Sequence, residues 1–177
     1  MPRKQDPLTM EYLLLGVINR APIHPYDLNK LLKSDPDLKS IWHFEQSRLY
    51  ALLDKLEKNG LITSKMEEGD AFPFRKVYHI TREGKFLFSL WLQEPAAHHN
   101  ELRSSFLAKL YFLREYPEEL SDLVDRQIVL CKEWAEKARF EGEGDYLQML
   151  SAFRAAMIRA AIDWLEQIRK TYCNPMN

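Results

Sequence analysis

Residues 46–59, QSRLYALLDKLEKN, combine a stripe of leucines with polar side chains that could bind a polyanion. The three- and four-residue spacing of the leucines predicts an amphipathic helix with one buried face. The first half of this helix offers, on its other faces, Gln46, Ser47, Arg48, Tyr50 and Ala51. Gln and Arg can each make two hydrogen bonds to a base edge, Ser and Tyr can bind phosphate, and Ala lets the backbone approach closely. The pattern is that of a helix reading DNA with its first two turns.

The same helix also fits an ordinary solvated surface. Asp54 and Lys58 have the spacing of an ion pair within one helix, and charged residues are common on helix surfaces. Lys55 lies on the same flank as Arg48 and would extend the basic edge. The helix alone therefore leaves both interpretations open, and its neighbours must decide.

Three segments precede this helix. Thr9 is a candidate cap for a first helix that ends at Arg20, and Pro25 suits the start of a second, over residues 26–32, that begins with Tyr26. The run Asp35-Pro36-Asp37 is expected to break that helix. Residues 38–44 are then expected to form an irregular connector.

A hairpin is predicted after the helix. Gly60 would end the helix, a first strand would begin at 61–63, and a second would return at 76–80. Thr81 would then cap a helix over 82–92. The inward side chains of that helix are expected to be Phe86, Leu87, Leu90 and Trp91. The hairpin is expected to carry three basic residues, with Lys65 across from the pair Arg75 and Lys76. Charged hairpin edges often only prevent pairing with other sheets. Following three helices, however, this hairpin makes the order of a winged helix-turn-helix, whose second motif helix lies in the DNA major groove.

The pattern changes after Glu94, which predicts a domain of residues 1–94 and another of 95–177. The second reads as helical, with a stripe of Leu102, Phe106, Leu110 and Leu113 followed by two long helices of nearly heptad spacing. A short turn at 141–145 between them predicts an antiparallel coiled-coil pair, and a second subunit would cover the apolar side chains left over. The expected fold class is thus mainly α, with a β wing.

Composition bounds the function further. The net charge is -1, with 46% hydrophobic and 29% charged residues. Residues 1–95 hold 14 Lys and Arg against 13 Asp and Glu, a net of +1, so any basic surface must be local. The start has no signal-peptide cleavage pattern and no apolar run reaches the ~18 residues of a bilayer span, which suggests a cytoplasmic protein. No catalytic motif or cofactor site is recognisable, so we expect no enzyme and no cofactor.

Several other residues have a functional and a structural interpretation. His98-His99 is a weak metal candidate, because neighbouring side chains diverge and no third ligand is near in sequence; no metal site is expected. His24 and His43 suit capping or packing better than pH sensing. Cys131 suits a buried seam, whereas Cys173 could be a reactive thiol near the chain end. Four tryptophans could line a ligand pocket, although each also suits a core: Trp42, Trp91, Trp134 and Trp164.

Three linked segments, HPYDLNKLL, SRLYALLDKLEKNGLI and RKVYHITREG, resemble the DNA-binding domain of the PadR family of transcriptional regulators. The second half, from LRSSFLAKLYFLREYP onward, resembles that family's virulence-activator-like C-terminal region. One departure is Pro25, where the family usually has glycine. Proline suits a helix start, so the fold should change little, but a backbone contact to phosphate would be lost.

The resemblance implies a homodimer on a pseudo-palindromic operator, acting as a repressor that a small aromatic or hydrophobic effector releases. It implies DNA contacts from Tyr26, Tyr50 and the pair Arg75-Lys76. The alternative is a protein–protein adaptor that uses the winged helix as its docking surface, which the near-neutral charge of residues 1–95 favours.

Overall fold

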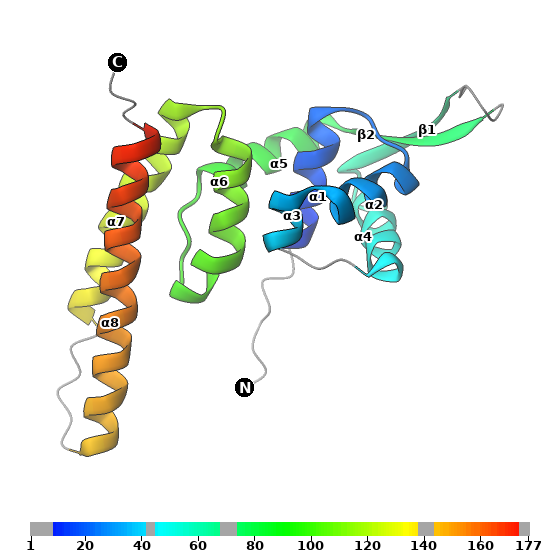
Figure 1. Ribbon diagram of the computed structural model, residues 1–177. Coiled ribbons are helices and arrows are strands. Elements are labelled where there is room, and N and C mark those ends of the chain that lie inside the picture. The colour runs from blue at the N-terminus through cyan, green and yellow to red at the C-terminus, as the bar shows by residue number, and fades with distance from the viewer. Residues whose placement is uncertain (1–8, 42–44, 68–73, 138–143, 174–177) are drawn as a thin grey trace. The chain divides into compact units, whose positions relative to one another are not determined.

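The computed structural model describes residues 9–41, 45–67, 74–137 and 144–173 of the chain. These belong to two compact units, residues 1–92 and 93–177, of which the first carries the sheet (Figure 1). The described residues are mainly helical, with one two-stranded antiparallel sheet. The predicted fold class, mainly α with a β wing, is confirmed.

The first unit follows the winged-helix order. It contains, in sequence, α1 (Thr9–Arg20), α2 (Pro25–Ser34), α3 (Pro36–Ile41), α4 (Gln46–Lys58), β1 (Ile62–Glu67), β2 (Arg75–Ile80) and α5 (Arg82–Gln93). Its core is built mostly from the leucines of the first helices, with Leu13, Leu14, Leu28, Leu49 and Leu53 all fully buried. The apolar stripes predicted for α1 and α4 are therefore the faces that these helices bury in a common core.

The predicted break of the second helix at Asp35-Pro36-Asp37 is confirmed, because α2 ends at Ser34. The irregular connector expected from residue 38 is wrong, because a third helix begins at Pro36 and continues to Ile41. The Asp35 carboxylate accepts hydrogen bonds from the backbone N–H groups of Asp37 and Leu38, at 2.9 and 3.0 Å. Pro36 occupies the first helical position, where its missing N–H costs nothing. Leu38 of this short helix is fully buried, so α3 contributes to the core. Residues 42–44, with Trp42 and His43, lie outside the described residues.

The capping predictions for α2 and α5 are confirmed. The His24 ring accepts a hydrogen bond at Nδ1 from the Tyr26 N–H, 3.1 Å away, and Pro25 is the first residue of α2. Thr81 Oγ1 accepts from the Gly84 N–H at 3.0 Å and donates to the Gly60 carbonyl at 2.7 Å. Thr81 thus joins the start of α5 to the end of α4.

Two glycines are required where α4 passes into the wing. Gly60 has a φ of 71°, in the left-handed region that glycine enters without strain, and it follows the C-cap Asn59. Gly84 allows a close approach, because a Cβ atom there would lie 2.1 Å from the Leu61 carbonyl oxygen. The path from the helix into the hairpin therefore depends on both.

The strands pair in the register Ile62 with Ile80 through Glu67 with Arg75. Lys65 lies opposite Val77, so the prediction that it faces the Arg75-Lys76 pair is wrong by one position. The opposite edge of β2 is also occupied, since Ile23 and Tyr78 exchange backbone hydrogen bonds of 3.1 and 3.0 Å. The wing is thereby bonded to the segment that starts α2.

The inward face of α5 differs from the prediction. Trp91 is buried and stacks on Tyr12 with ring centroids 5.0 Å apart, and Phe88 is buried beside it. Phe86 and Leu90 are exposed instead, at 57% and 44%. The periodicity located the helix correctly but misplaced its buried face by part of a turn.

The second unit is all helical in the residues described. It contains η1 (His99–Glu101, 3-10), η2 (Leu102–Phe106, π), α6 (Leu107–Leu113), α7 (Pro117–Lys137), α8 (Asp145–Ile168) and η3 (Arg169–Cys173, π). The single helix expected over 102–113 is therefore a π-helical turn followed by an α-helix. Phe106 and Leu113 of the predicted stripe are buried, and Leu102 and Leu110 are half-buried.

The long helices α7 and α8 pack side by side and antiparallel (Figure 1). The heptad positions of α7 are buried, including Leu120, Val124, Ile128 and Cys131. The side chain of Gln127, a polar residue on the same face, accepts a hydrogen bond from the Ala96 N–H at 2.6 Å and donates one to the Ala96 carbonyl at 3.2 Å. This polar residue holds the segment that enters the unit.

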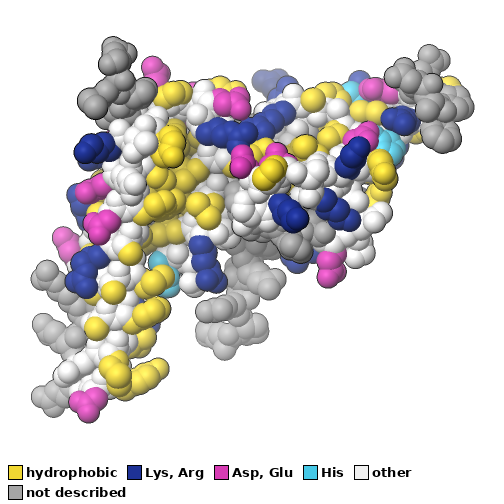
Figure 2. All heavy atoms as spheres, in the orientation of Figure 1, with side chains coloured by type: hydrophobic (Ala, Val, Ile, Leu, Met, Phe, Trp, Pro, Cys, Tyr) yellow, Lys and Arg dark blue, Asp and Glu magenta, His cyan; other side chains and the backbone are white. Residues whose placement is uncertain are grey.

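The heptad pattern of the last helix predicts a seam with α7 formed by Tyr146, Leu150, Phe153, Met157, Ala160, Trp164 and Ile168. Of these, Tyr146, Phe153 and Met157 are exposed, whereas α8 buries Ile158 and Leu165, which lie outside the pattern. Five large hydrophobic side chains of α8 are exposed, among them Leu147 at 41%. The spacing of the other four places them on one side of the helix, with Tyr146 at 72%, Met149 at 63%, Phe153 at 61% and Met157 at 49%. Hydrophobic side chains gather along this helix in Figure 2. We call this surface, residues 146, 149, 153 and 157, the α8 stripe.

The cysteines are both free and buried. The expectation of a buried Cys131 is confirmed, while the idea of Cys173 as a readily reactive thiol is not supported. Burial raises the pKa of each thiol, and Asp125 adds to the rise at Cys173. Among the described residues, no helix is long and apolar enough to cross a membrane.

Candidate nucleic-acid interface

The first two turns of α4 present the predicted binding side chains to solvent. Gln46, Ser47, Arg48 and Ala51 are exposed, and Tyr50 is 42% exposed. In the ranges that the structure describes, none of their side chains has a hydrogen bond or ion pair. The helix carries no acid in its first turn, and the N-cap residue Glu45 makes no side-chain capping bond to it. This half of α4 can meet an anion without first breaking a contact.

The second half of α4 is different, because its charged side chains are already paired. Lys58 Nζ lies 2.7 Å from Asp54 Oδ2, as the four-residue spacing predicts. The hydrogen bond to Asp54, and after it the charge of that carboxylate, raises the pKa of Lys58. Charge on this half of the helix is largely neutralised.

Lys55, predicted as a DNA contact, is directed to α1. Its Nζ lies 2.7 Å from Oε1 of Glu11, a carboxylate that is only 3% exposed. Glu11 lies in the first turn of α1, where a negative charge is favourable, and it is also the partner of Lys55. Unlike the residues of the first two turns, Lys55 already has an ion-pair partner.

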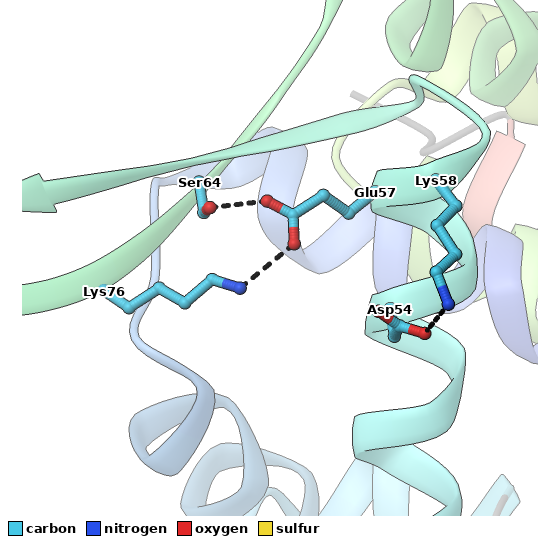
Figure 3. Close-up of polar contacts among 5 residues, drawn as sticks. All are labelled: Asp54, Glu57, Lys58, Ser64 and Lys76. Atoms are coloured by element: carbon cyan, nitrogen blue, oxygen red, sulfur yellow. Dashed lines mark hydrogen bonds and ion pairs between the residues drawn. The ribbon is translucent and has the colours of Figure 1, made fainter.

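Lys76 of the wing is also paired. Its Nζ lies 3.0 Å from Oε2 of Glu57 on α4, while Oε1 of Glu57 accepts a hydrogen bond from the Ser64 hydroxyl of β1 (Figure 3). The ammonium also lies 4.8 Å from the centre of the Tyr78 ring. Tyr78 and then Glu57 raise the pKa of Lys76, which therefore stays charged.

The remaining predicted wing contacts have no such partner. Lys65 is exposed on β1, and Arg75 is half-exposed at the start of β2. Glu67, opposite Arg75 in the register, pairs with His79 at 2.7 Å. Neither basic side chain forms an ion pair within the part of the chain described. Tyr26 at the start of α2 is 62% exposed.

Sequence reasoning missed the polar cluster of Glu57, Ser64 and Lys76. Glu57 lies beyond the two turns that were predicted to bind DNA, and Ser64 belongs to no motif. Nothing in the spacing links them, because the turn at Gly60 brings together a helix position and two strand positions. Only the pairing register of the two strands could have suggested this cluster, and the predicted register was wrong by one position.

A hollow of about 390 Å3 lies within the second unit. Its lining is mostly apolar and includes Leu102, Leu107, Trp134, Met157, Ile158 and Trp164, with Arg103 and His99 as the charged or titratable members. Of the four tryptophans considered, two therefore line one hollow. Trp91 belongs to the core of the first unit, and Trp42 lies outside the described residues. No cluster that could hold a metal occurs among the residues described.

The sequence matches a known family over residues 14–89, the family described as Transcriptional regulator PadR-like. No curated protein matches the chain. Three similar solved structures cover nearly all of it at low identity. Bacillus subtilis PadR in complex with operator DNA is 22% identical, covers 92% of this chain and 98% of its own, and has a TM-score of 0.46.

For the same Bacillus subtilis protein in complex with p-coumaric acid the identity is 22%, the coverages are 93% and 98%, and the TM-score is 0.45. The PadR-like transcriptional regulator BC1756 from Bacillus cereus is 21% identical, with coverages of 94% and 97% and a TM-score of 0.48. The family assignment depends on the sequence match, which runs from within α1 to within α5. Over residues 14–89, this chain is therefore similar to the Transcriptional regulator PadR-like family.

Proposed function

We propose that the protein is a sequence-specific DNA-binding transcriptional regulator, in which the first two turns of α4 read the major groove. One observation carries the proposal: the charged side chains of α4 are divided, with Arg48 unpaired near its start and Asp54, Lys55, Glu57 and Lys58 all paired further on. A surface meant only to be solvated has no reason to keep its first half free. A base-reading helix does, because each reading side chain must reach a base edge.

The wing adds non-specific affinity in this proposal. Lys65 and Arg75 are the side chains that can reach phosphate without giving up a partner, and Tyr26 can hydrogen-bond phosphate from the start of α2. Such contacts position the protein on the duplex and make its affinity depend on salt.

The proposed regulator is a homodimer and a repressor. The α8 stripe supports the first part, because exposed apolar stripes of this kind mark association surfaces. A two-fold dimer would place two copies of α4 on the half-sites of a pseudo-palindromic operator. Repression and release by an effector follow from the family resemblance. The apolar hollow with Trp134 and Trp164 is where an aromatic effector would find stacking surface, with Arg103 for an acidic group.

Replacing Arg48 and Tyr50 by Ala tests the reading helix. The operator is first obtained by selecting genomic fragments, and affinity is measured by fluorescence anisotropy. Loss of the Arg48 contact alone corresponds to about 1–3 kcal/mol, so the double variant should bind at least tenfold more weakly. Lys58→Ala, on the same helix but outside the first two turns, is the matched control. A double variant that binds like the wild type would show that α4 is not the reading helix.

The alternative function is a protein–protein adaptor that docks through the winged helix. The near-neutral charge of residues 1–95 is the observation that favours it. Salt dependence separates the two functions. For a DNA-binding protein, the logarithm of the affinity falls linearly with the logarithm of the salt concentration, and the number of phosphate contacts sets the slope. If the selection retains no fragment even at low salt, the adaptor becomes the better interpretation.

A further inference from the structure

The cluster of Glu57, Ser64 and Lys76 joins three elements of the first unit. Glu57 lies near the end of α4, Ser64 on β1 and Lys76 on β2, so one carboxylate binds both strands of the wing (Figure 3). Each oxygen of the carboxylate has its own partner, the Ser64 hydroxyl for Oε1 and the Lys76 ammonium for Oε2. The side chain of Glu57 is 30% exposed, so these contacts are partly shielded from water.

Among the described residues, no other hydrogen bond or ion pair joins a side chain of α4 to either strand of the wing. A two-stranded hairpin is marginally stable by itself and needs packing or bonding to a larger body. The pKa of Glu57 is lowered by the Ser64 hydrogen bond first and by Lys76 after it, against the opposing effect of burial, which shows that the charged carboxylate is the bonded form.

We propose that Glu57 is a positioning residue, which fixes the wing at one angle to the reading helix and so sets where Lys65 and Arg75 meet the DNA backbone. This inference rests on the proposed DNA-binding function. Glu57 itself makes no favourable contact with DNA. Its negative charge is unfavourable near phosphate, and its benefit is the geometry of the wing.

A purely electrostatic effect and a positioning effect therefore predict opposite changes in DNA affinity for Glu57→Ala. Removing a negative charge near a polyanion should tighten DNA binding, and it would also free Lys76. If Glu57 acts by positioning, the variant should instead bind operator DNA about tenfold more weakly, because the wing loses both of its bonds to α4.

Asp54→Ala is the matched control. Asp54 lies one turn earlier on the same helix, is exposed, and bonds only Lys58 of its own helix (Figure 3). The substitution removes the same charge without touching the wing. It should bind operator DNA as tightly as the wild type or slightly more tightly, which separates the charge effect from the positioning effect.

A second measurement does not depend on DNA. Amide hydrogen exchange of the full-length chain should become faster in both strands, residues 62–67 and 75–80, in Glu57→Ala, and stay at the wild-type rate in Asp54→Ala. Glu57→Asp, with a shorter side chain, should exchange at an intermediate rate. Equal exchange in Glu57→Ala and Asp54→Ala would overturn the proposal, and so would tighter operator binding by Glu57→Ala. If the wild type binds no DNA, the proposed function fails, and the exchange rates still decide whether Glu57 fixes the wing.

Discussion

The Lys55 ammonium lies 2.7 Å from the Glu11 carboxylate, and that carboxylate is 3% exposed. The pair joins α4 to the first turn of α1, on the side of α4 that Arg48 also flanks. It therefore gives Lys55 a structural reason to be basic, independent of any ligand.

Replacing Lys55 by Ala leaves the Glu11 carboxylate buried without its partner. We expect a loss of about 1–3 kcal/mol in the free energy of unfolding, the cost of an unsatisfied buried polar group. Lys58→Ala removes an exposed pair on the same helix and should cost clearly less, because water screens that pair. Urea denaturation followed by circular dichroism compares the two. Equal losses would mean that the Glu11 pair contributes no more than a surface pair.

The same variant tests the predicted DNA contact of Lys55. A lysine that binds phosphate contributes about one unit to the slope of log affinity against log salt. We expect the slope of Lys55→Ala to equal that of the wild type, because its charge is committed to Glu11. A slope reduced by about one would restore Lys55 to the DNA-binding set.

Glu57 makes the stability of the wing depend on pH. A carboxyl whose pKa is lower in the folded state stabilises that state above its unfolded pKa, and this contribution is lost as the pH falls through the folded pKa. The pKa of Glu57 is held below its usual 4.5. The urea midpoints of wild type and Glu57→Ala should thus differ most at neutral pH and converge as the pH falls through the folded pKa of Glu57, which lies below 4.5. An equal difference between the two urea midpoints at neutral and at acidic pH would contradict a lowered pKa of Glu57.

Gly84 should not tolerate even alanine. The added Cβ would lie 2.1 Å from the Leu61 carbonyl oxygen, so the backbone must move where the wing joins α5. Overpacking of this kind costs about 1–3 kcal/mol, measured as a lower urea midpoint. Ser89→Ala, an exposed position on the same helix, is the control and should be close to neutral. A neutral Gly84→Ala would mean that the junction is looser than this contact indicates.

The α8 stripe should hold the dimer together. Phe153→Glu places a charge in the stripe and should raise the dimer dissociation constant on the order of 100-fold, as measured by analytical ultracentrifugation. Gln148→Glu adds the same charge at an exposed position of α8 outside the stripe and should leave the constant unchanged. If the two variants behave alike, the stripe is not the association surface.

The order of elements was predictable because it depends on local signals. The leucines of α4, Pro25 and Thr81 each act within one or two turns of their own position, and the structure agrees with them. The helix that begins at Pro36 was not predicted, because the residues that end α2 also cap and start α3. That ambiguity is local too, but only the burial of Leu38 resolves it.

The partners of the charged residues could not be predicted. Lys55 and Glu11, or Lys76 and Glu57, meet only after the chain has folded, and neither spacing carries a signal. The α8 stripe shows a different limit. Periodicity finds an apolar face but does not say which surface covers it, and here α7 packs beside that face and not on it.

The backbone pairing of Ile23 with Tyr78 has a consequence for the growing chain. The two residues are separated in sequence by α2, α3, α4 and β1, so this bridge closes a long loop. A ribosome delivers Ile23 well before Tyr78, and the first residue has no strand to pair with in the interval. The helices can form as they emerge, but the segment in front of α2 gains its backbone partner only after the last strand of the wing has been synthesised.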